Sequence, residues 1–96
     1  MEIIAYTSEG CYYCDQLHEL FRRADVKYTA IKVLSQLPEG VEPDNDKNLM
    51  LRSDFQTQFP AIYGFPYVII DGKPIGALIE TAKFLMKEGL VSAKKR

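Results

Sequence analysis

The stretch Gly10-Cys11-Tyr12-Tyr13-Cys14 contains both cysteines of the 96-residue chain. It stands at the start of an amphipathic pattern whose apolar residues recur at helical spacing. Cys14 lies on the apolar stripe, so its sulfur is predicted to face inward, whereas Cys11 lies one turn earlier at the helix N-terminus. One helical turn rises about 5 Å, which suits the short Cα separation of a disulfide. The pair is therefore predicted to close and reopen as a disulfide without moving the rest of the fold. The stripe continues through Leu17, Leu20, Phe21 and Ala24.

The position of Cys11 at a helix N-terminus also predicts its chemistry. The unpaired N–H groups and the helix dipole favour negative charge there, and the thiolate is the reactive form of cysteine. A buried Cys14 is expected to stay a thiol until it is needed, so Cys11 is the predicted attacking sulfur and Cys14 the resolving one. The alternatives are a structural disulfide or half of a metal site. Zinc normally takes four ligands. Cys11, Cys14 and His18 supply only three donors in this stretch, so we expect no metal site.

Composition predicts a single domain over residues 1–96, with 92–96 as a basic tail. The chain is 47% hydrophobic and 26% charged, which is ordinary for a soluble globular protein. A net charge of −1 gives no general affinity for nucleic acid, and no apolar run approaches the roughly 20 residues of a membrane span. Neither a leader sequence nor a secreted disulfide framework is evident. We therefore expect a cytoplasmic monomer that has neither nucleic acid nor a membrane as its partner.

Strand-like and helical patterns alternate along the chain. The first strand, helix and strand fall within about 30 residues, which predicts a right-handed βαβ unit with parallel strands. Asp71-Gly72 is typical of a hairpin turn between two later strands. The elements together predict an α/β fold in which three helices flank a mixed four-stranded sheet. The predicted strands cover residues 3–6, 27–33, 67–70 and 73–76, and the predicted helices cover 12–24, 44–58 and 78–86.

This element order, with a Cys-x-x-Cys motif opening the first helix, resembles the thioredoxin fold. Within that fold the chain is most similar to a small glutaredoxin, and nearly the whole chain takes part in the likeness. The long second loop and the Cys-x-Tyr-Cys variant also resemble glutaredoxins encoded by large phages. Four motifs carry the resemblance: Tyr6-Thr7, Cys11-x-Tyr13-Cys14, Phe65-Pro66 and Asp71-Gly72-Lys73-Pro74-Ile75-Gly76.

The resemblance implies a dithiol–disulfide oxidoreductase that uses a redox-active Cys11–Cys14 disulfide. It implies no tightly bound cofactor, glutathione as reductant, and disulfide-containing protein substrates such as ribonucleotide reductase. It also implies a cis peptide bond before Pro66, which would face the cysteines and leave the Phe65 backbone free to pair with an extended substrate. The residues that it assigns to glutathione or substrate binding are Tyr13, Phe65, Pro66, Gly76, Ala77, Leu78 and Ile79.

Several residues depart from the glutaredoxin pattern, and most of the changes fall where glutathione would bind. They leave the dithiol chemistry intact but predict weak glutathione binding, held mainly by backbone groups. Glu80 and Thr81 are the nearby candidates to replace the missing aspartate. The departures are Tyr12 for the usual proline, Ser8 for a common lysine, Gly64 for a threonine, and Ile79 for the aspartate that meets the glutathione amino group.

Three other functions stay open at this point. Some glutaredoxins without the motif proline bridge an iron–sulfur cluster between two subunits through the first cysteine, here Cys11, and glutathione. A thioredoxin-like protein would instead be reduced by a thioredoxin reductase. A redox-regulated interaction module would change its partner affinity without turnover.

Overall fold

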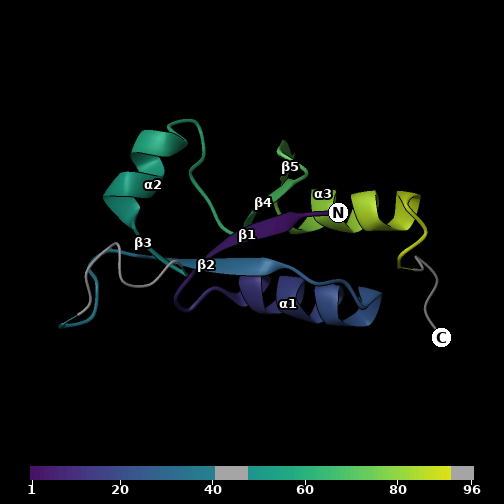
Figure 1. Ribbon diagram of the computed structural model, residues 1–96, viewed down its shortest axis with the longest axis horizontal. Helices are drawn as coiled ribbons and strands as arrows, with labels where there is room; N and C mark the ends of the chain where they lie inside the picture. The colour runs from purple at the N-terminus through teal and green to yellow at the C-terminus, as the bar shows by residue number, and fades with distance from the viewer. Residues whose placement is uncertain (41–47, 92–96) are drawn as a thin grey trace.

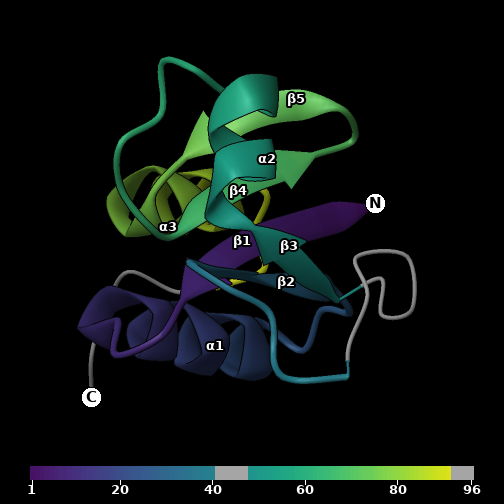
Figure 2. The ribbon, with the colours of Figure 1, turned by 90° about the vertical axis from the view of Figure 1, so that its left-hand side faces the viewer.

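The structure is a computed structural model that describes residues 1–40 and 48–91 of the chain (Figure 1). A mixed sheet has the strand order β3-β2-β1-β4-β5, and helices pack on both of its faces (Figure 2). The elements are β1 (Ile3–Ser8), α1 (Tyr12–Ala24), β2 (Thr29–Leu34), β3 (Leu49–Leu51), α2 (Arg52–Gln58), β4 (Tyr67–Ile70), β5 (Lys73–Gly76) and α3 (Leu78–Lys87).

The first part of the chain forms the predicted β1-α1-β2 unit. β1 and β2 are parallel, in a register that pairs Ile4 with Thr29 and Ser8 with Val33. The helix has the predicted bounds, Tyr12–Ala24, and ends at Asp25, whose left-handed φ of 57° terminates the helical conformation. Because β1 runs directly into the loop before α1, the carboxyl end of this strand positions the cysteine motif.

The second part is an antiparallel hairpin followed by α3. The sequence predicts a hairpin turn at Asp71-Gly72. The two residues have φ angles of 52° and 79°, and two successive positive values are typical of a type I′ turn. β4 pairs with β1 and places β5 at the edge of the sheet. That edge position is compatible with Pro74, which has no N–H to donate to a further strand.

The prediction of a helix over residues 44–58 is wrong for residues 48–51, and the predicted count of four strands is wrong as well. Leu49–Leu51 form β3, which pairs in parallel with β2, and α2 begins only at Arg52. These three apolar residues pair with the edge of β2 that β1 leaves free. A search for helical spacing cannot detect this pairing, because the partner strand is distant in the sequence. The predicted cap at Asp44 or Asn45 and the basic tail at 92–96 lie outside the described residues.

The two faces of the sheet build two apolar cores. α1 and α3 lie together on one face, whereas α2 lies on the other face, near β2 and β3 (Figures 1 and 2). The division follows the period of two along each strand: Ala5 and Val68 face α1 and α3, while Tyr6 and Tyr67 face α2. In residues 1–40 and 48–91, no helix has the length and apolar character needed to cross a membrane.

Candidate redox-active site

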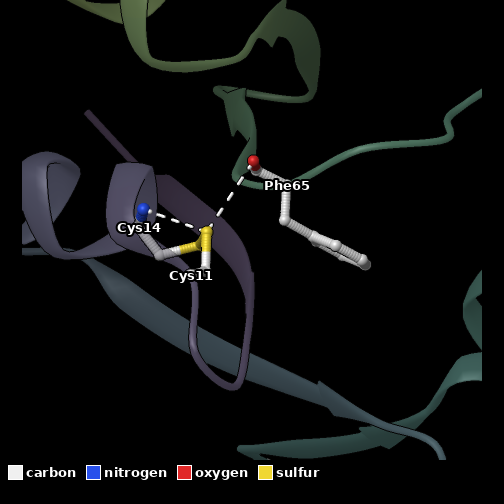
Figure 3. The surroundings of a disulfide bond; sticks show 3 residues. All are labelled: Cys11, Cys14 and Phe65. Carbon is white, nitrogen blue, oxygen red and sulfur yellow. Dashed lines mark hydrogen bonds between the residues drawn. A yellow bond between two sulfur atoms is a disulfide. The ribbon is translucent and has the colours of Figure 1, made fainter.

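Cys11 and Cys14 form a disulfide at the N-terminus of α1. Their Cα atoms are 5.2 Å apart, a separation within the usual disulfide range. Cys14 is 2% exposed, as its place on the apolar stripe predicted, while Cys11 is half-buried. The Cys11 sulfur takes the N-cap position and accepts the backbone N–H of Cys14 at 3.1 Å (Figure 3). The half-buried Cys11 sulfur thus accepts a helix N–H group, and the buried Cys14 sulfur lies behind it.

The backbone of Phe65 lies beside the exposed sulfur. The register between β1 and β4 pairs Tyr6 with Tyr67, so the segment that enters β4 meets the loop that leaves β1. The Phe65 carbonyl oxygen points toward the Cys11 sulfur at 3.8 Å (Figure 3), a contact to which a reduced Cys11 can donate its S–H. The Phe65–Pro66 peptide bond is cis, as the resemblance implied.

A groove of about 320 Å³ adjoins the disulfide. It runs between the first turn of α1, the segment before β4 and the N-terminus of α3. Its walls are mainly apolar, and Glu80 is the one charged residue among the lining groups. The lining residues are Tyr13, Phe65, Pro66, Ala77, Leu78, Ile79 and Glu80.

The predicted binding residues meet in this groove with one exception. Gly76 lines a neighbouring hollow that shares Phe65, Pro66 and Ala77 with the groove. These residues come from α1, the β4 entry and the β5–α3 junction, which are far apart in the sequence and are brought together by the sheet pairing. Their role in binding stays a prediction.

Glu80, which the sequence offered only as a candidate replacement for the missing aspartate, also lines the groove. Its Oε1 accepts the backbone N–H of Ala77 at 3.1 Å, so the carboxylate folds back over the start of α3. Gly76 makes room for it, because a Cβ on Gly76 would lie 2.9 Å from the Cβ and Cγ atoms of Glu80. The sequence signal for this arrangement is a glutamate three residues after the N-cap, a weak one when the cap is alanine.

An aromatic cluster supports the Phe65 side of the groove from below. The Phe65 ring packs on Phe55, with ring centroids 5.0 Å apart, and Phe55 in turn contacts Tyr6 at 5.3 Å. Burial raises the pKa of Tyr6, and the neighbouring Tyr67 phenol adds to the shift. The Tyr6 phenol therefore stays neutral in the physiological pH range, and its ring packs with Phe55 beside the Phe65 segment.

Four large side chains from the cysteine motif, the groove and the hollows beside it are exposed. Tyr12 is 67% exposed, Tyr13 59%, Tyr63 90% and Ile79 63%. Single exposed apolar residues are common on protein surfaces, but Tyr12, Tyr13 and Ile79 flank the reactive sulfur or line its groove. This end of the molecule thus offers apolar surface to a bound molecule.

His18, which the sequence offers as a third soft ligand, is engaged elsewhere. Its Nδ1 atom is hydrogen-bonded to the Tyr28 hydroxyl at 2.6 Å, and the two rings lie close at 5.7 Å. Burial raises the pKa of Tyr28, which keeps the phenol neutral. Across the described part of the chain, no three His, Cys, Asp or Glu side chains are grouped so as to hold a metal ion.

Comparison with known proteins identifies the fold. The chain is similar to the crystal structure of glutaredoxin 1 from Francisella tularensis, with 20% identity, a TM-score of 0.62, and coverage of 93% of this chain and 95% of that one. It is also similar to wheat glutaredoxin, at 23% identity and TM-score 0.59 over 95% of this chain and 78% of that one. Reduced Escherichia coli glutaredoxin matches at 16% identity and TM-score 0.51, over 95% and 100% of the two chains.

These likenesses confirm the predicted fold, the thioredoxin fold as glutaredoxins have it. The sheet has five strands rather than the predicted four. No protein-family model matches the chain, and no curated protein sequence does. At these identities the likeness extends to the fold alone, so the activity has to be argued from the site.

Proposed function

We propose that the chain is a glutaredoxin-like dithiol–disulfide oxidoreductase that works through Cys11 and Cys14. The observation that carries the proposal is the disulfide at the N-terminus of α1, with a half-buried sulfur in front and a buried one behind. A purely structural disulfide needs neither a groove at its exposed sulfur nor a helix N–H group directed at it.

The first step is attack by the Cys11 thiolate on a substrate disulfide. A bond forms between the Cys11 sulfur and one substrate sulfur, and the substrate S–S bond breaks. The second substrate sulfur leaves as a thiolate and takes a proton from solvent. The Cys14 N–H and the α1 N-terminus favour the thiolate form of Cys11, because both place positive partial charge next to the sulfur.

The second step resolves the mixed disulfide. Cys14 loses its proton and attacks the Cys11 sulfur, which releases the remaining substrate sulfur as a thiol and leaves the Cys11–Cys14 disulfide. Two electrons have then passed from the dithiol to the substrate. An external thiol reductant returns two electrons and two protons, and we propose glutathione for this role, with a thioredoxin-type reductase as the alternative donor.

The proposed setting is that of a cytoplasmic monomer that reduces protein or glutathione mixed disulfides. Ribonucleotide reductase is the protein substrate that the resemblance suggests. The groove residues Tyr13, Phe65 and Pro66, with the α3 N-terminus, are the proposed contacts for the substrate chain. The Phe65 backbone supports this assignment, because an extended peptide can pair with it as an added strand.

The test compares Cys11→Ser with Cys14→Ser. We expect Cys11→Ser to abolish the reduction of bis(2-hydroxyethyl) disulfide, because the attacking thiolate is lost. We expect Cys14→Ser to accumulate a mixed disulfide on Cys11, visible by mass spectrometry, because the resolving thiol is missing. Preferential alkylation of Cys14 by iodoacetamide in the reduced protein would contradict the assignment of the two roles.

A coupled assay separates the two electron donors. Turnover with glutathione and glutathione reductase is measured beside turnover with thioredoxin reductase, both with NADPH consumption as the readout. Turnover with either system supports the oxidoreductase. Failure with both, in a protein whose Cys11 still reacts once with a disulfide, would favour a redox-regulated interaction module.

A further inference from the structure

The charged groups in and around the groove bear on which disulfide substrates the protein prefers. Of its lining residues only Glu80 is charged, and its carboxylate already accepts the Ala77 N–H at 3.1 Å. One of the backbone N–H groups at the start of α3 that could receive a carboxylate from a bound molecule is thus occupied by a carboxylate of the protein itself. Gly76 is needed for this arrangement, because a Cβ there would meet the Glu80 side chain at 2.9 Å.

The surrounding segments add further negative charge. Glu9 and Asp15 flank the cysteine motif and are exposed. Neither lysine nor arginine occurs in residues 8–16, 59–66 or 76–80, the three segments that meet around the Cys11 sulfur. The cations Arg23, Arg52 and Lys83 line adjacent hollows rather than the groove. A bound molecule therefore meets apolar walls and carboxylates.

The remaining features of the groove suit a polypeptide. Within the described residues, no backbone group pairs with the Phe65 N–H or carbonyl, so an extended chain can pair with them beside the reactive sulfur. Tyr13 and Ile79, which are 59% and 63% exposed, line the groove and offer apolar contacts to the side chains of such a chain.

Glutathione matches this surface poorly. It carries two carboxylates and one ammonium group at neutral pH, and in the groove its anionic ends would meet Glu80 but neither a lysine nor an arginine. Like charges brought together at an interface disfavour the wrong partner and slow its approach.

We infer that the preferred oxidised substrate is an extended peptide segment of a protein disulfide, with apolar side chains beside its cysteine and a basic residue directed toward Glu80, rather than a glutathione disulfide. This inference rests on the proposed oxidoreductase function and names the substrate class of the same site. The chemistry is the two-step exchange described above, with the peptide cysteine in the substrate disulfide.

The test uses mixed disulfides of 2-mercaptoethanol with four thiols. Three are blocked tetrapeptides: one with leucines flanking its cysteine and a C-terminal lysine amide, one with glutamate in place of that lysine, and one with serines in place of the leucines. The fourth is glutathione. Rapid acid quench, alkylation and mass spectrometry give the second-order rate constant for oxidation of the reduced protein by each.

We expect the leucine–lysine peptide to react fastest, with glutathione at least tenfold slower. Glu80→Gln should reduce the ratio of the peptide rate constant to the glutathione rate constant by about threefold, the scale of one exposed charge pair. Salt at 1 M should reduce this ratio further, because the Debye length falls to about 3 Å. Gln can still accept the Ala77 N–H. The matched control is Glu88→Gln at the far end of α3, exposed and outside the groove, which should leave the ratio unchanged.

Two results would overturn the inference: glutathione reacting as fast as the leucine–lysine peptide, or Glu80→Gln changing the ratio no more than Glu88→Gln does. Bis(2-hydroxyethyl) disulfide, which is small and uncharged, distinguishes failure of the proposed oxidoreductase function from failure of the substrate preference. A protein that reduces it without discriminating among the four thiols keeps the proposed function and loses this inference. A protein that reduces none of the five disulfides loses both.

Discussion

Replacing Gly76 with alanine tests the arrangement at the start of α3 directly. Gly76 has a φ of 129°, a conformation that L side chains rarely adopt, and a Cβ there would lie 2.9 Å from two carbon atoms of Glu80. The backbone conformation costs about 1–3 kcal/mol for a residue with a side chain. Displacing a packed neighbour adds about 1–3 kcal/mol. We therefore expect Gly76→Ala to lower the free energy of unfolding by about 4 kcal/mol, the middle of the combined range of about 2–6 kcal/mol.

Two other glycines provide matched controls for the two parts of this cost. Gly72 has a φ of 79° but nothing within 4 Å of an added Cβ, so Gly72→Ala should show only the backbone cost, about 1–2 kcal/mol. Gly64 has neither a positive φ nor a close neighbour, and Gly64→Ala should change stability by less than about 1 kcal/mol.

Urea unfolding of the oxidised proteins, monitored by circular dichroism, measures the three values under one condition. The expected order of destabilisation is Gly76, then Gly72, then Gly64. If Gly76→Ala costs no more than Gly72→Ala, the contact with Glu80 has no energetic weight, and the account of Glu80 as a carboxylate held over the α3 N-terminus is wrong.

Three further predictions follow from the site. Phe55→Ala should lower the free energy of unfolding by about 3–5 kcal/mol and also slow disulfide reduction by the molecules that remain folded, because Phe55 supports the Phe65 segment; an unchanged rate per folded molecule would contradict that support. Because burial raises the pKa of Tyr6, the folded state holds its proton more tightly than the unfolded state, so its stability should be constant below about pH 9 and fall as pH rises above the unfolded value of about 10. Urea titrations at several pH values should show a shallower alkaline loss for Tyr6→Phe. The double variant Ser8→Lys with Ile79→Asp should lower the KM for glutathione at least tenfold in steady-state kinetics, since each charge-assisted contact is worth about 1.5–3 kcal/mol; an already low parent KM that the variant leaves unchanged would show that other residues bind glutathione.

Local signals were sufficient for much of the fold. The apolar stripe from Cys14 to Ala24 predicted the bounds of α1, because the buried face of an amphipathic helix carries apolar residues at helical spacing. Asp71-Gly72 predicted the hairpin because a type I′ turn needs two positive φ angles. The buried position of Cys14 followed from the same stripe. Each of these features depends on residues within one turn or two of each other.

The features that the sequence could not settle depend on partners far away in the chain. Leu49–Leu51 became a strand because the edge of β2 was open beside it, and no local pattern in three apolar residues tells a strand from the first turn of a helix. The groove exists because sheet pairing brings the first turn of α1, the Phe65 segment and the α3 N-terminus to one end of the molecule. The sequence offers Glu80 as a candidate replacement for the missing aspartate, but the tertiary structure decides that its carboxylate folds back onto the Ala77 N–H, where Gly76 leaves it room.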